Sequence, residues 1–296
     1  MLDSTWTYGV ELEFADVDRR TPLPLGSSWN TKDYTICNTG GVGNDPTGQL
    51  WPYGGEINTQ PTVNIPEQCV VIHDIIAALH ERPPTINYRC NLHCHVGIPG
   101  LKDDLASLQK IERYFVRHAA TIFKYIQPIP VPLASRSHAA HEGAVARYKR
   151  RLRSHQWVTP AKAHAACMAA KTPQEFFDAY SPKDAKGRVL HHLAIRSAVN
   201  IRQLMDTGTI EFRHFAGTLD LVQYETCLNW CRLFLFAALQ DRPVEQLLSR
   251  FKTEQFPKFE PYRHDWEEIY QLTNFGSNSR KQVAANLERL KAEGQI

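Results

Sequence analysis

Near the N-terminus the chain reads Tyr8-Gly9-Val10-Glu11-Leu12-Glu13-Phe14, and the expected fold is built outward from this stretch. Its apolar and charged residues alternate strictly, which is typical of a β-strand with one buried face. Glu11 and Glu13 therefore project from the same face, roughly 6.5–7 Å apart along the strand. Such a pair on its own is most often the solvated face of an amphipathic strand. Polar residues on other strands of the chain favour a different interpretation.

Length and composition describe a globular protein with an ample core. The chain has 296 residues, 43% of them hydrophobic, and Lys plus Arg exceed Asp plus Glu by only 34 to 31. So small an excess indicates no nucleic-acid or membrane partner, and no apolar run reaches the roughly 20 residues of a membrane span. Met1-Leu2-Asp3-Ser4 leads directly into the first strand, so we expect no secretory signal. The seven cysteines are odd in number and scattered, and we therefore expect reduced thiols and a cytoplasmic protein. Composition leaves the oligomeric state open.

Local patterns predict further strands and helices. Period-two alternation and turn residues place strands at 54–59, 87–99, 198–204 and 209–215, and helical periodicity places helices from Pro66 to about Pro83, at 102–126, within 160–180, at 219–239 and at 280–293. The turn-rich stretch 16–55 is interpreted as a loop or hairpin, because it lacks the Gly-Lys-Ser/Thr of a phosphate loop. The pattern predicts an α+β fold, a sheet with helices packed on one face, in a single domain covering 1–296.

Four of the expected strands carry polar side chains on a common face. Glu56 lies on the second strand, His93 and His95 share a face of the third, and Glu211 and Arg213 share a face of the last. Like charges about 4 Å apart repel by roughly 4 kcal/mol at an effective dielectric near 20. A cation between them would remove this cost, and carboxylates with a minority of imidazole suit Mg²⁺ or Mn²⁺. A zinc site built from Cys90, His93, Cys94 and His95 is the alternative, although alternation points Cys94 away from both histidines.

Taken together, these motifs resemble the amidoligase family, a branch of the carboxylate–amine ligase superfamily that includes glutamine synthetase and glutamate–cysteine ligase. The resemblance is carried, in the family's order, by Gly9–Phe14, Gly55–Pro61, Asn91–Gly97 and Gly208–Asp220. It implies a glutamine-synthetase-like, largely antiparallel sheet. Two weaker matches, Ser135-Arg136 and Arg196-Ser197-Ala198-Val199-Asn200-Ile201, fall where the family carries arginines and an asparagine that face the active site. Ser197 stands in place of the family's usual tyrosine. Residues after about 240 match no motif.

The resemblance implies an ATP-dependent ligase that activates a carboxylate as an acyl phosphate, which an amine then attacks. It implies two or three Mg²⁺ or Mn²⁺ ions as cofactors. Glu13, His93 and Glu211 would hold the ion under the β- and γ-phosphates of ATP, and Glu11 and Glu56 would hold the ion near the acyl acceptor. The substrates would be small-molecule or peptide carboxylates and amines, whose identity the sequence does not reveal.

Other residues receive their roles from the same resemblance. Arg213 would donate to the γ-phosphoryl oxygens, and His95 and Glu56 would act at the substrate. Arg136 and Arg196 would contact the nucleotide. Two other functions stay open at this point: a guanidine-type phosphotransferase on the same fold, and a non-catalytic module that binds metal or nucleotide. The basic run at 147–153 is either a solvated helix face or a lid over an anionic ligand.

Overall fold

The computed structural model describes residues 5–15, 17–30, 54–79, 84, 90–125, 158–159, 161–181 and 197–247. These residues belong to two compact units. The first unit contains the described residues within 1–99 and 211–232, and the second contains those within 100–127, 153–210 and 233–247. Every described residue of the candidate site lies in the first unit.

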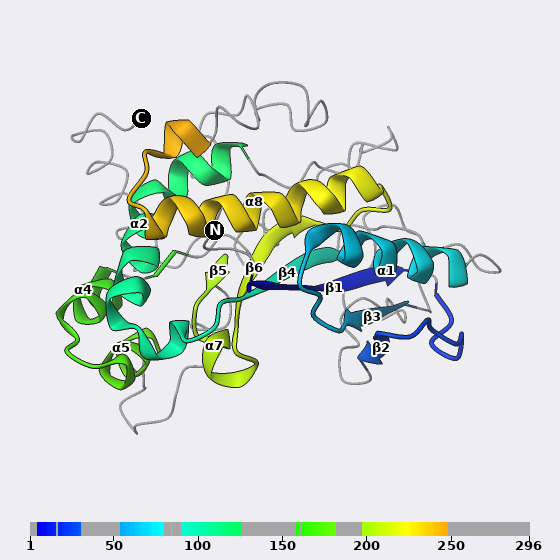
Figure 1. The fold of residues 1–296 in the computed structure, drawn as a ribbon, viewed down its shortest axis with the longest axis horizontal. Helices are drawn as coiled ribbons and strands as arrows, with labels where there is room; N and C mark the ends of the chain where they lie inside the picture. The colour runs from blue at the N-terminus through cyan, green and yellow to red at the C-terminus, as the bar shows by residue number, and fades with distance from the viewer. Residues whose placement is uncertain are drawn as a thin grey trace, which may run out of the picture. The chain divides into compact units, whose positions relative to one another are not determined.

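The described strands form one sheet in the order β2-β3-β1-β4-β6-β5 (Figure 1). Their bounds are β1 Thr7–Ala15, β2 Ser27–Asn30, β3 Gly54–Thr59, β4 Asn91–Gly97, β5 Val199–Asn200 and β6 Thr209–Ala216. The pairs β2–β3, β3–β1 and β1–β4 are antiparallel. The stretch with the two glutamates is thus an interior strand, with a hydrogen-bonded neighbour on each side.

Strand register places polar and apolar residues on opposite faces of the sheet. Glu13 pairs with Glu56, and Glu11 pairs with His93. Leu12, between them, pairs with Ile57 on one side and Leu92 on the other. Residues directly opposite each other in an antiparallel pair point to the same face. Leu12, Ile57 and Leu92 are at most 1% exposed, so this face belongs to the core, and the glutamates and histidines share the other face, called the site face below.

Seven helices lie in the part of the chain that the structure describes. Their bounds are α1 Ile65–Ala78, the 3-10 turn η1 Leu101–Asp103, α2 Leu105–Tyr125, α4 Ala161–Ala169, α5 Pro173–Tyr180, α7 Gln203–Asp206 and α8 Leu221–Leu239. In the first unit, α1 and the N-terminal part of α8 lie on the core side of the sheet (Figure 1). The expected α+β class, with a largely antiparallel sheet, is confirmed. No described helix is both long and apolar enough to cross a membrane.

A threonine side chain joins β1, β3 and α1 just before the site. The Thr59 hydroxyl accepts hydrogen bonds from the backbone N–H of Val10, at 2.9 Å, and from Nε2 of Gln68 on α1, at 2.6 Å. It donates to the carbonyl of Val10 at 3.3 Å. The hydroxyl thus replaces backbone partners where β3 ends before Pro61, which has no N–H to donate. This junction fixes β1 immediately next to Glu11.

The second unit contains a buried carboxylate of its own. Glu112, on α2, is fully buried. Its Oε2 accepts a hydrogen bond from the Thr159 hydroxyl at 3.1 Å, and its Oε1 lies 3.1 Å from Nδ1 of His164 on α4. Both oxygens are therefore paired, as a buried carboxylate requires. This network ties α2 to α4 and is separate from the candidate site.

Several sequence expectations differ in detail from the structure. The stretch 16–55, interpreted as a loop or hairpin, contains a short strand, β2, which pairs antiparallel with β3 as the strands of a hairpin do. Trp29 of β2 donates through Nε1 to the carbonyl of Thr21 at 3.0 Å. The expected strand at 198–204 is limited to Val199–Asn200, because Arg202 adopts helical angles and α7 follows at once. The six described cysteines are thiols outside any disulfide; five are buried, and Cys69 is half-buried. The loop at 127–142, the basic run at 147–153 and the helix at 280–293 lie outside the described residues.

Candidate active site

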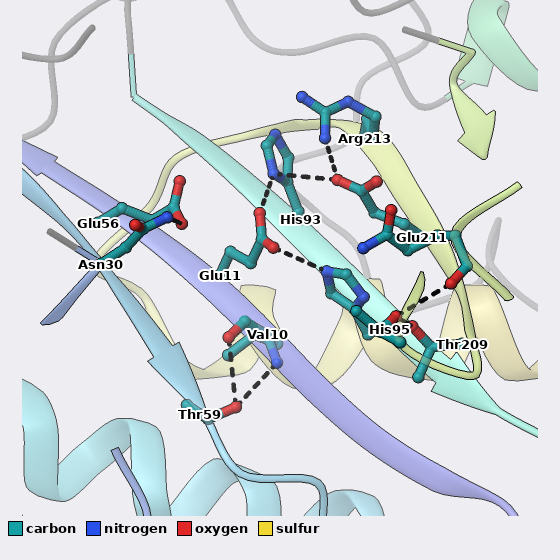
Figure 2. Close-up of polar contacts among 12 residues, drawn as sticks. Val10, Glu11, Asn30, Glu56, Thr59, His93, His95, Thr209, Glu211 and Arg213 are labelled. Atoms are coloured by element: carbon teal, nitrogen blue, oxygen red, sulfur yellow. Dashed lines mark hydrogen bonds and ion pairs between the residues drawn. The ribbon is translucent and has the colours of Figure 1, made fainter. Parts of the chain in front are cut away.

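Glu11 lies between the two histidines of β4 on the site face (Figure 2). Its Oε2 is 2.6 Å from Nδ1 of His93, and its Oε1 is 3.2 Å from Nε2 of His95. Burial alone would raise the pKa of Glu11. The hydrogen bonds and charges of His93 and His95 outweigh burial and hold this pKa well below its usual value. Glu11 is therefore an anion at neutral pH.

His93 is surrounded by three carboxylates. Besides its contact with Glu11, its Nδ1 lies 3.4 Å from Oε1 of Glu211, and its Nε2 lies 3.9 Å from Oε1 of Glu13. Burial and the nearby charge of Arg213 oppose protonation of His93. The hydrogen bond with Glu11 and the charges of Glu11 and Glu211 prevail and raise the pKa of His93. The surrounding carboxylates thus favour the protonated form of this imidazole in the absence of a cation.

Glu211 and Arg213 come from alternate positions of β6 and reach the same cluster (Figure 2). Arg213 donates from Nη1 to Oε1 of Glu211, which is 3% exposed in its side chain. One ligand atom each from Glu11, His95 and Glu211 lies within 4.8 Å of the others. Among the described residues this is the group of acidic, imidazole or thiol side chains that can hold a metal ion.

Glu13 and Glu56 extend the cluster toward the β3 side. They face each other across β1 and β3, and both are nearly fully buried. Burial, together with the charges of Glu11 and Glu13, raises the pKa of Glu56 to about 7, against the opposing effect of the hydrogen bond from Nδ2 of Asn30. Glu56 is therefore about half protonated near pH 7, because it is buried and faces a second carboxylate.

The site has an excess of negative charge that a divalent cation would balance. Glu11, Glu13 and Glu211 surround the imidazoles and the guanidinium, and Glu56 lies opposite Glu13. Three of these four carboxylates, those of Glu13, Glu56 and Glu211, are at most 4% exposed. Oxygen donors with one or two imidazoles are the ligands that Mg²⁺ and Mn²⁺ accept. Arg213 Nε is buried and has no hydrogen-bond partner among the described residues. The donor set therefore fits a cation, and the arginine fits an anion bound next to it.

Comparison with protein families identifies a relationship that agrees with this chemistry. A family model described as "Putative amidoligase enzyme" matches residues 33–235, more than two thirds of the chain. The chain belongs to the amidoligase family. Membership supports a ligase-type activity, and it confirms the resemblance drawn from the sequence motifs. Glu56, His93, His95, Glu211 and Arg213 lie within the matched range, whereas the two glutamates of β1 precede it.

Comparisons with individual proteins are more distant. Across 98% of this amidoligase, the backbone is similar, with a TM-score of 0.42 and 12% sequence identity, to the crystal structure of a bifunctional glutathione synthetase from Pasteurella multocida. The chain covers 48% of that protein, so it spans about half of its length. The search of curated protein sequences found no match.

The structure brings most of the predicted site residues of this amidoligase together. Those that meet on the site face are Glu11, Glu13, Glu56, His93, His95, Glu211 and Arg213. Arg136 and Arg196 lie outside the described residues. The group that can hold a metal ion, Glu11, His95 and Glu211, contains His95, for which the sequence predicted a substrate role. His93, which the sequence predicted to be a metal ligand, contacts three carboxylates. Cys90 and Cys94 are fully buried, and neither joins the metal-binding group.

Two asparagines at the site received no role from the sequence. Asn91 donates to Glu13 from both its backbone N–H and its side chain, and Asn30 donates to Glu56. Asn91 precedes His93 by two residues, so strand alternation alone would have placed it on the site face. Asn30 carried no such signal, because its four-residue strand lies in a stretch dominated by turn residues.

Proposed function

We propose that this amidoligase is an ADP-forming ligase that uses ATP and Mg²⁺ or Mn²⁺ to join a carboxylate to an amine through an acyl phosphate. The observation that carries the proposal is the group formed by Glu11, His95 and Glu211, with Arg213 in contact with Glu211. It combines a cation-binding group with an arginine, and enzymes that transfer a phosphoryl group from ATP stabilise its charge with metal ions and cationic side chains of this kind. Membership of the amidoligase family supports the second part of the proposal, that the product is an amide.

The chemistry of amide formation explains why such a site is needed. A carboxylate is a poor acyl donor, because its leaving group would be oxide, and phosphorylation supplies a better one. Divalent cations, when bound, neutralise charge on the β- and γ-phosphates. Glu11, His95 and Glu211 would hold one cation, and Glu13, Glu56 and His93 supply further ligands beside it. This grouping differs from the division implied by the family motifs, in which His93 and Glu13 share the ion with Glu211.

Arg213 is proposed to bind the transferring phosphoryl group. Its Nη1 is held by Glu211, which orients the guanidinium, and its buried Nε is without a hydrogen-bond partner among the described residues. A guanidinium can donate two parallel hydrogen bonds to phosphate oxygens, whereas a lysine offers a single ammonium. The same contact with Glu211 would keep Arg213 in place between turnovers. The substrates are a small-molecule or peptide carboxylate and an amine.

The test is a screen of amino acids and polyamines for ADP and phosphate release by the full chain with ATP and Mn²⁺, followed by mass spectrometry of the product. A substrate whose carboxylate carries ¹⁸O should transfer label to the released phosphate, as an acyl phosphate requires. A guanidine-type kinase would release ADP and a phosphorylated product but no free phosphate. A non-catalytic module would bind Mn²⁺ and turn over no substrate, and either result would overturn the proposal.

Matched variants separate the site from the rest of the fold. Glu211→Gln should abolish turnover, because the cation loses a ligand and Arg213 loses its partner. Glu67→Gln, in the exposed first turn of α1, removes a carboxylate outside the site and should leave turnover unchanged. Near-normal turnover of Glu211→Gln would refute the assignment.

A further inference from the structure

One line of polar side chains crosses four neighbouring strands on the site face. Asn30 of β2 pairs with Glu56 of β3, and Glu56 pairs with Glu13 of β1. Asn91, the first residue of β4, contacts Glu13 from the other side. The order across the sheet is therefore asparagine, glutamate, glutamate, asparagine, and we call it the Asn–Glu–Glu–Asn row.

Each asparagine of the row binds the glutamate next to it through one carboxylate oxygen. Asn91 donates twice to Oε2 of Glu13, from its backbone N–H at 2.7 Å and from Nδ2 at 2.8 Å. Asn30 donates from Nδ2 to Oε1 of Glu56 at 2.5 Å. Asn91 is 6% exposed and Glu13 is 4% exposed, so this pair of hydrogen bonds lies in a buried place.

These hydrogen bonds oppose a motion that the two glutamates would otherwise favour. Like charges directly opposite each other on paired strands repel, and rotation of the side chains would relieve the repulsion. Two donors that converge on Oε2 restrain the Glu13 carboxylate. Its other oxygen, Oε1, is the one that approaches Nε2 of His93, at 3.9 Å. The restraint thus keeps one defined oxygen of Glu13 directed into the cluster.

We propose that Asn91 and Asn30 are positioning residues, which hold Glu13 and Glu56 in the orientation that binds a divalent cation. This inference rests on the proposed function, because it takes both glutamates as cation ligands. Groups that hydrogen-bond to metal ligands generally change metal affinity or activity about 10- to 100-fold when they are removed. Loss of the Asn91 side chain should have the larger effect, because its hydrogen bond to Glu13 is buried, whereas Asn30 is only half-buried.

The experiment measures Mn²⁺ binding to the full chain by calorimetry, without nucleotide or substrate. Asn91→Ala should raise the Kd for Mn²⁺ about 10-fold or more, and Asn30→Ala should raise it by a smaller factor. Asn64→Ala is the matched control: Asn64 caps α1 by accepting a hydrogen bond from the backbone N–H of Glu67, and it lies outside the strands that carry the proposed ligands. It should lower the Tm and leave the Kd for Mn²⁺ unchanged.

A double-mutant cycle distinguishes positioning from a purely structural role. In a Glu13→Gln background, Asn91→Ala should have no further effect on the Kd for Mn²⁺, because the ligand that it positions is gone. Asn91→Ser, which is closer in size and polarity, provides the same comparison if Asn91→Ala does not fold. A variant of Asn91 that lowers the Tm but binds Mn²⁺ like wild type would overturn the positioning role alone. Wild-type protein that does not bind Mn²⁺ would overturn the proposed function and this inference together.

Discussion

Replacing Glu56 with glutamine changes the charge of the site and little of its shape. Glutamine keeps an oxygen that can accept the hydrogen bond from Nδ2 of Asn30, so the local geometry should persist. Burial, together with the charges of Glu11 and Glu13, raises the pKa of Glu56 from 4.5 to about 7. Each pKa unit corresponds to about 1.4 kcal/mol. Ionised Glu56 therefore destabilises the metal-free fold by on the order of 3 kcal/mol.

The sign of the pH dependence follows from the direction of this shift. Between pH 4.5 and about 7 the folded state holds a proton on Glu56 that the unfolded state has released. The free energy of unfolding therefore falls as pH rises through this window, and the contribution levels off above it. Glu56→Gln has no such proton. The free energy of unfolding of Glu56→Gln, relative to that of wild type, should therefore rise by about 3 kcal/mol across the window.

The assay is urea unfolding of both proteins in the presence of a metal chelator, at several pH values between about 5 and 8. Glu67→Gln is the control, because it removes an exposed carboxylate outside the cluster. Curves of wild type and Glu56→Gln that run parallel over the whole range would refute the reasoning. So would a metal-free variant that is less stable than wild type at the alkaline end.

Addition of Mn²⁺ should reverse the order of stability. A ligand that binds only the folded protein stabilises it by an amount that grows with the logarithm of its concentration relative to Kd. Wild type keeps the Glu56 carboxylate as a ligand, and Glu56→Gln does not. Wild type should therefore become the more stable protein when Mn²⁺ is in excess. If Glu56→Gln has the larger free energy of unfolding at every Mn²⁺ concentration, Glu56 binds no cation.

Three further predictions concern the phosphate contact and the packing beneath the site. Arg213→Lys should lower kcat for ATP turnover by at least about 10-fold while leaving the Kd for Mn²⁺ unchanged, because an ammonium cannot reproduce the guanidinium fork; kinetics that match wild type would contradict this role. Leu12→Ala should reduce the free energy of unfolding by about 2–5 kcal/mol, since Leu12 is 1% exposed between the two glutamates, and a loss below about 1 kcal/mol in urea unfolding would contradict its place in the core. Gly217→Ala would put a Cβ 2.8 Å from Cβ of Cys90 and 3.0 Å from its backbone. We expect this substitution to reduce the free energy of unfolding by about 1–3 kcal/mol in urea unfolding. An unchanged free energy of unfolding would contradict so close an approach.

The strands that form the site could be predicted because their signals are local. Alternation over Val10–Phe14 and over Asn91–Gly97, together with Pro61 after the second strand, needs no knowledge of the rest of the chain. The strand at 27–30 could not be found in this way. It contains only four residues, and it exists because β3 offers a free edge and Trp29 is anchored to Thr21. Its formation depends on a neighbour that is distant in sequence.

The contacts within the site are a consequence of strand order, which alternation does not encode. Alternation puts Glu11, His93 and Glu211 on particular faces, but it does not say which strands are neighbours. The order β3-β1-β4-β6 makes Glu11 the partner of both histidines and sets Glu13 opposite Glu56. The same order explains why Asn91 meets Glu13. A sequence interpretation could thus name the ligands, whereas their pairing required the fold.

The interior position of β1 explains how the site holds so much negative charge in a small space. Because β3 and β4 pair with β1 on its two sides, Glu13 lies between Glu56 and Asn91, and Glu11 lies between Asn58 and His93. On an edge strand, water and salt would screen the same glutamates from one side. Here the balancing groups must come from neighbouring strands or from a bound cation. Leu12 keeps the opposite face in the core whatever the charge of the glutamates, so a change on the site face should appear first in cation affinity and pH dependence.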